Sequence, residues 1–139
     1  MAGNLSNYLQ PKILDLLFSN VAYSIPATLY FALYTVTPTN AGGGTEASGG
    51  SYARVTLTNN ATNFPAAPGT SPATKGNGSF SFAAATADWS AQAPMVAWGI
   101  FDALTSGNLL VWGPLTENKI VYNGDTVTVA ANGLAITID

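Results

Sequence analysis

The residues of this sequence that could carry acid–base chemistry are its carboxylates. A pair of carboxylates with different pKa values, held on either side of a bond, is the arrangement that hydrolyses glycosides. No two of the carboxylates share a predicted strand at i, i+2 spacing, which would place both on one face. The set is Asp15, Glu46, Asp88, Asp102, Glu117, Asp125 and Asp139. We therefore expect no enzymatic activity and no catalytic residue.

Asp102 is the carboxylate with the most apolar neighbours, in the stretch WGIFDALTSGNLLVW that runs from Trp98 to Trp112. It follows an apolar run and precedes the turn signal Thr-Ser-Gly-Asn at 105–108. A short carboxylate at such a junction accepts backbone N–H bonds from the turn. We predict that Asp102 is a turn residue and not a catalytic acid.

The sequence contains no cysteine and no histidine. Disulfides, thiolate nucleophiles and cysteine-ligated metals are thereby excluded, together with the commonest general base and metal ligand. The spacings of Asp and Gly that build EF-hand or glycine-rich calcium loops are also absent. We expect no metal site and no cofactor.

Charged residues make up only 8% of the chain, and apolar residues make up 47%. Ordinary soluble domains carry about 25% charged residues, so we expect other subunits to cover much of this surface. With four cations and a net charge of −3, nucleic-acid binding through a basic face is excluded. No apolar stretch approaches the roughly 18 residues of a membrane span, and the first 25 residues lack the pattern of a secretory signal.

The aromatic residues allow two interpretations. Trp89, Trp98 and Trp112 could form a stacking platform for a sugar. Alternatively, Trp98 and Trp112 lie symmetrically about the turn and face each other across two strands as core or interface partners. We favour the second interpretation and include both as candidate subunit-interface residues.

Arg54 is the only arginine and stands just where a predicted strand begins. In a chain with so few cations we expect it to have a specific partner. Glu46 and a carboxylate of a neighbouring subunit are the two candidates, because arginine suits interface pairing. The alternative is that Arg54 is an ordinary exposed charge of the strand; we also include it as a candidate interface residue.

The only helical period lies near the N-terminus, in YLQPKILDLLFSN. Leu9, Ile13 and Leu17 fall on one stripe, with Leu14 and Phe18 beside it. Ser6 could cap a start near residue 7. We prefer a start at Pro11, where the missing N–H costs nothing, and we place the helical segment at about 7–19. Leu9, Ile13, Leu17 and Phe18 are candidate interface residues.

From residue 27 onward the chain is β-rich. Between 27 and 35 the period is two, with Leu29, Phe31 and Leu33 alternating with Tyr30, Ala32 and Tyr34. The other expected strands are 51–59, 79–83, 94–103, 108–115, 119–123, 125–131 and 134–139. Two long loops, 37–51 and 59–78, separate the earlier strands. About eight short strands behind one helix predict an all-β fold, a jelly-roll-like sandwich or barrel, in a single domain over 1–139.

The order of these segments resembles a known family. LSNYLQPKILDLLF is followed by PATLYFALYT, GTEASGGSYARVTLT, WGIFDALTSGNLLVWGPLT and GDTVTVAANGLAITID. This succession is similar to small structural proteins of tailed bacteriophages and prophages, often labelled phage tail fibre protein-like. The resemblance covers nearly the whole chain, and the loop 59–78 is the part that matches least. Pro11 departs from the pattern, in which a helix-favouring residue is usual.

The resemblance implies a non-enzymatic virion structural protein, assembled in the host bacterial cytoplasm. The sequence has neither the repeats nor the heptads of an elongated fibre shaft. We therefore expect a capsid-decorating or cement protein, forming a homotrimer and binding the major capsid protein. The alternative is a tail or tail-fibre-associated protein that binds tail subunits, with recognition of a host glycan as an option. No nucleic-acid or membrane partner is expected.

Overall fold

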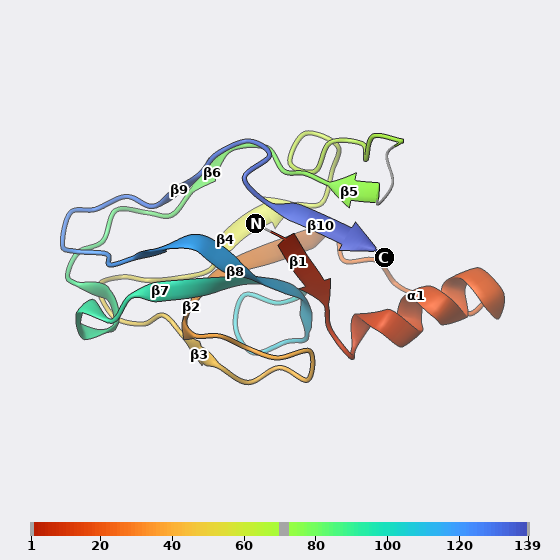
Figure 1. Cartoon of the computed structure of the whole chain (residues 1–139), viewed down its shortest axis with the longest axis horizontal. Helices are drawn as coiled ribbons and strands as arrows, with labels where there is room; N and C mark the ends of the chain where they lie inside the picture. The colour runs from red at the N-terminus through yellow and green to blue at the C-terminus, as the bar shows by residue number, and fades with distance from the viewer. Residues whose placement is uncertain (1, 70–72, 139) are drawn as a thin grey trace.

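The chain forms a mostly β structure with one helix, and the computed structural model describes residues 2–69 and 73–138 (Figure 1). The helix α1 spans Leu9–Phe18, and a short 3₁₀ turn spans Trp89–Gln92. The strands are β1 (Ala2–Leu5), β2 (Thr28–Val36), β3 (Thr45–Glu46), β4 (Val55–Thr58), β5 (Ala73–Lys75), β6 (Phe80–Ser81), β7 (Met95–Phe101), β8 (Leu109–Lys119), β9 (Thr128–Val129) and β10 (Ala135–Ile138).

Eight of the strands form one mixed sheet. Its order is β3-β2-β7-β8-β1-β10-β5, and β4 pairs with a second part of β2. The N-terminal strand β1 lies between β8, to which it is antiparallel, and β10, to which it is parallel. The strands β6 and β9 form a separate pair. The expected all-β class with one N-terminal helix is confirmed, and the sheet does not close into a barrel.

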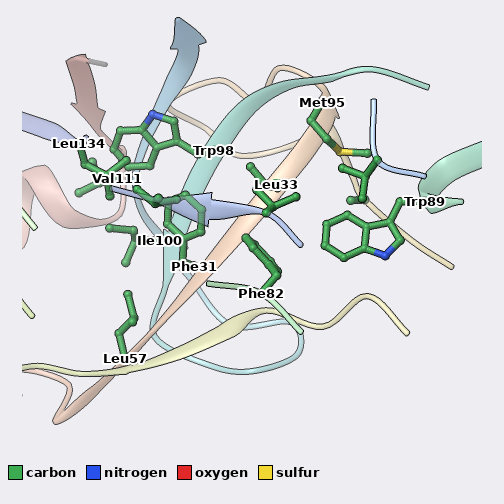
Figure 2. Close-up of a cluster of buried hydrophobic side chains, with 14 of the residues drawn as sticks. Phe31, Leu33, Leu57, Phe82, Trp89, Met95, Trp98, Ile100, Val111 and Leu134 are labelled. Atoms are coloured by element: carbon green, nitrogen blue, oxygen red, sulfur yellow. The ribbon is translucent and has the colours of Figure 1, made fainter. Parts of the chain in front are cut away.

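The main core lies on one face of the large sheet. Phe31 and Leu33 of β2 and Trp98 and Ile100 of β7 pack there against residues of the later segments, including Phe82 and Leu134 (Figure 2). A smaller cluster on the other face contains Ala32, Tyr34, Ala97, Phe101 and Leu109. The predicted alternation in 27–35 is therefore confirmed, and both of its faces are buried between residues 31 and 34.

Several short strands escaped the sequence analysis. The strands β3 and β5 lie inside the two segments expected to be loops, and β1 precedes the helix. The expected strand 119–123 is wrong, because only Lys119 belongs to a strand, the last residue of β8. The apolar residue Val121 is buried in the core although it does not belong to a strand. Its carbonyl accepts the Trp89 N–H at 3.0 Å. Asp139, the end of the expected strand 134–139, lies outside the described residues.

The helix begins two residues before the expected start at Pro11. The Leu9 N–H lies 3.2 Å from the Ser6 hydroxyl, and the Leu9 and Gln10 N–H groups both approach the Ser6 carbonyl. Pro11 is the third residue of α1. The first N–H groups of a helix have no intrahelical partner, so a proline in the first turn removes no hydrogen bond.

Candidate assembly surface

The helix α1 is attached to the sheet through the residues that precede it. Ser6 is buried and its N–H donates to the Leu110 carbonyl at 2.9 Å. Next to it, the Asn7 N–H donates to the Asn40 carbonyl at 2.7 Å. Because β1 is itself paired on both sides, these bonds fix the direction in which α1 leaves the sheet. Figure 1 shows the helix projecting from one end of the β body.

The chain returns from α1 to the sheet along residues 19–26. Asn20 adopts φ = +52°, a left-handed conformation that asparagine tolerates and that ends the helix. The Val21 N–H then donates to the Asp15 carbonyl at 3.1 Å. At the far end, Asn59 holds the segment by donating its side-chain amide to the Pro26 carbonyl at 2.9 Å. We call residues 9–26 the arm.

The arm carries large apolar side chains that its own chain does not cover. No residue of α1 is buried. Phe18 is 82% exposed and Leu17 is 67% exposed, whereas Leu9 and Ile13 are only partly exposed. The other exposed apolar residues of the arm are Leu14, Leu16, Val21 and Ile25. Of the four candidates on the helix, the structure thus places Leu17 and Phe18 fully at the surface.

Val21 and Ile25 were not among the candidates chosen from the sequence. They come after the predicted helix, between Asn20 and Pro26, where neither a helix nor a strand was expected. The observation that could have identified them is that large apolar residues continue beyond the predicted helix, where no helix or strand was expected to cover them.

A groove of about 400 Å³ lies at the base of the arm. Leu5, Ile13 and Leu14 form its apolar side, and Asn4, Gln10 and Asn40 contribute polar groups. The Gln10 side-chain amide donates to the Leu5 carbonyl at 2.9 Å, which fixes one rim. None of its lining residues is charged.

Arg54 has its partners within the chain. Its guanidinium forms a two-pronged ion pair with Glu46, at 2.9 Å from Nε to Oε1 and 2.8 Å from Nη2 to Oε2. Its Nη1 donates to the carbonyls of Ala103 and Ser106, both at 2.8 Å. The guanidinium carbon also lies 3.6 Å from the centroid of the Phe101 ring. Of the two partners expected for Arg54, the structure shows Glu46.

The three tryptophans do not form an exposed platform. Trp98 is 0% exposed, so its ring offers no surface to another subunit in this fold, and Trp89 is also buried. Trp112 is half-buried on the opposite face of the sheet, and its indole N–H donates to the Asn40 side chain at 2.9 Å. This distribution favours packing over sugar stacking.

Trp98 and Trp112 are not cross-strand partners, contrary to the expectation from their symmetry about the turn. Phe101 pairs with Leu109, but Ile100 pairs with Val111, so Leu110 is an extra residue in β8. This bulge shifts the register by one position, and Trp98 lies opposite Gly113 while Trp112 lies opposite Gly99. A shift of one residue moves a side chain to the other face of the sheet.

The carboxylates with defined partners have structural roles. Asp102 accepts the Asn108 backbone N–H at 2.7 Å and the Asn108 side-chain amide at 2.8 Å, as expected of a turn residue. Asp88 accepts the Asn123 N–H and the Gln92 side-chain amide, both at 2.8 Å. Both bonds lower the pKa of Asp88 below its ordinary value, and the bond from Asn123 has the larger effect. Within residues 2–69 and 73–138, no group of His, Cys, Asp or Glu side chains could hold a metal ion.

A comparison with protein families finds a family model that matches this chain. The family model described as podophage GP4 fiber I protein gp80 matches residues 4–137. The chain belongs to this family. It is accordingly a non-enzymatic component of a phage fibre and of the virion, and other tail or fibre subunits are its partners. Comparison with curated proteins gives no match.

The family match revises the position expected within the virion. It supports the tail-fibre alternative better than the capsid-decorating role. The capsid-decorating role was expected because the sequence lacks repeats and heptads, and the matching fibre family shows that this reasoning was insufficient. In the part of the chain that the structure describes, no helix is long and apolar enough to cross a membrane.

Proposed function

We propose that this fibre protein joins neighbouring virion subunits through its arm. The observation that carries the proposal is the exposure of Leu14, Leu17, Phe18, Val21 and Ile25 on one projecting element. Monomeric proteins rarely leave a contiguous apolar surface of this kind uncovered, and such surfaces mark protein–protein contacts.

The attachment of the arm supports the same role. The arm is held to the β body on both sides, through Asn7 just before it and through Pro26 at its end. A segment that is anchored at both ends loses less conformational freedom on binding than a free segment would. The arm is thus suited to a permanent contact between structural subunits.

The proposal is tested by placing a charge at the tip of the arm. Phe18→Asp should fold with an unchanged melting temperature, because this side chain contacts little of its own chain. The variant should be lost from purified particles of a phage that encodes it, as measured by quantitative mass spectrometry. Leu104→Asp is the matched control, because it places the same charge at an exposed leucine in a turn outside the arm. Particles that retain the Phe18→Asp protein at the wild-type level would refute the proposal.

A further inference from the structure

Part of the long strand β8 has no strand beside it. In the ladder with β7, the pairing passes from Pro114 directly to Lys119, so residues 115–118 have no partner on that side. On the other side, β1 pairs with residues 111 and 112 of β8. In the part of the chain that the structure describes, residues 115–118 are therefore extended backbone without a strand neighbour. Unpaired N–H and C=O groups of this kind are a template for pairing with another chain.

This segment of β8 differs from the outer strands of the sheet. The outer strands β3 and β5 are only two and three residues long, and short outer strands offer little backbone to another chain. In β8, by contrast, residues 116–119 are all exposed. This segment is therefore the longer edge that another strand can reach.

The exposed segment also borders an apolar pocket of about 300 Å³. Leu115, Glu117 and Lys119 lie on the rim of this pocket, and Leu33 and Met95 of the core contribute to its wall. A strand added along β8 would cover the pocket and remove apolar surface from water, which favours binding.

The charges of the segment select the chain that fits it. Glu117 and Lys119 are separated by one residue and border the same pocket, so they lie on the same face of the strand. Neither forms an ion pair within the described residues. If a second β8 approaches antiparallel with the two Asn118 residues opposite each other, Glu117 of each copy lies opposite Lys119 of the other. A parallel copy in the same register would instead oppose like charges, which is destabilising.

We infer that β8 of one copy pairs antiparallel with β8 of a second copy, about a two-fold axis at Asn118. Residues 116–120 then pair with the same residues of the other copy, and Glu117 and Lys119 form two ion pairs across the contact. A second copy supplies this pattern by symmetry, whereas another subunit would need a matching pair of charges at the same spacing. The contact is self-complementary and joins the copies in twos. It lies apart from the arm and goes beyond the proposed function.

The register of this contact is tested with a single cysteine, because the chain contains none. In the inferred pairing, Asn118 lies directly opposite its equivalent, close enough for a disulfide. Asn118→Cys should therefore form a disulfide-linked dimer in a glutathione redox buffer, as measured on non-reducing gels.

Thr116→Cys is the matched control for the cysteine test. It is exposed on the same segment, but in the inferred pairing it lies four residues out of register with its equivalent. It should stay monomeric. An Asn118→Cys protein that remains monomeric, or that cross-links no better than Thr116→Cys, would overturn the inference.

Charge reversal tests whether the partner is a second copy. In the Asn118→Cys protein, the added change Glu117→Lys opposes like charges at both pairs. It should raise the protein concentration needed for half-maximal cross-linking about tenfold, measured at equilibrium in the redox buffer. The further change Lys119→Glu restores opposite charges only where the partner carries both changes. Cross-linking should then return to its original level, and a failure to return would show that the partner is not a second β8 in this register.

A last variant separates this contact from the arm. Phe18→Asp, added to Asn118→Cys, should leave the cross-linking unchanged, because the arm takes no part in the β8 pairing. Loss of the cross-link in this variant would show that the arm, and not β8, holds the copies together. Because the charge and cysteine changes lie outside the arm, their failure would leave the proposed function standing.

Discussion

Arg54 contacts segments that are far apart in the sequence: the β3 strand through Glu46, and the turn after β7 through the carbonyls of Ala103 and Ser106. Its side chain is only 7% exposed. Arg54→Lys keeps the charge but cannot supply the planar fork of donors. It should lower the free energy of unfolding by about 1–3 kcal/mol in urea titrations, because carbonyl and carboxylate acceptors lose their donors.

The control for this substitution is Lys119→Arg, at an exposed position at the end of β8. It should change the free energy of unfolding by less than about 0.5 kcal/mol. Equal effects of the two substitutions would contradict the role assigned to the Arg54 network.

Tyr34, also at the residue scale, makes the stability sensitive to alkaline pH. Burial raises its pKa to about 12, the Glu46 carboxylate adds to the rise, and the Arg54 guanidinium opposes it. The folded state keeps a phenol proton that the unfolded state releases above about pH 10. This contribution to stability is complete below pH 10 and declines as pH rises through 12, by about 1 kcal/mol at pH 11.

The comparison is between wild type and Tyr34→Phe, each unfolded in urea at pH 8 and at pH 11. The loss of stability between the two pH values should be smaller in the variant. Some loss should remain, because burial also raises the pKa of Tyr52. An identical loss in both proteins would show that Tyr34 does not titrate differently on folding.

At the scale of elements, the backbone amides of α1 should be protected from hydrogen exchange only when the protein is assembled. The helix has ten residues and none of them is buried, and helices of this length are marginal in water without packing. In the Phe18→Asp variant, α1 amides should exchange with solvent hydrogen much faster than those of β2 and β7. In assembled fibres the α1 amides should become protected, as followed by hydrogen-exchange mass spectrometry. Fast exchange of α1 in assembled fibres would contradict burial of the arm.

The elements differ in how well the sequence predicted them. The strand 27–35 was predictable because its alternating residues fill two different clusters, on opposite faces of the sheet. The turn at Asp102 was also predictable, because its hydrogen bonds are local. The pairing of the strands was not predictable. The extra residue Leu110 moves Trp112 out of register with Trp98, and local sequence preferences do not indicate such a bulge. Tertiary pairing likewise creates β3 and β5, within segments whose composition is that of loops.

At the scale of the whole molecule, the low charge content has two explanations. Part of it reflects a sheet that is packed on both faces, with apolar clusters on each side of β2 and β7. The arm is the second, because apolar residues remain at its surface. The sequence predicted that other subunits would cover this protein, but composition alone did not indicate which face they would cover. The family match places those subunits in the phage fibre.

The position of β1 in the middle of the sheet has a consequence for the timing of folding. Its residues pair with Trp112 and Val111 on one side and with Ala135 and Ile136 on the other. Pairings between such distant residues form slowly, because a long loop must close before they contribute. During synthesis, β1 has no partner until most of the chain has left the ribosome. The arm therefore acquires its fixed direction late, only once the sheet around β1 has formed.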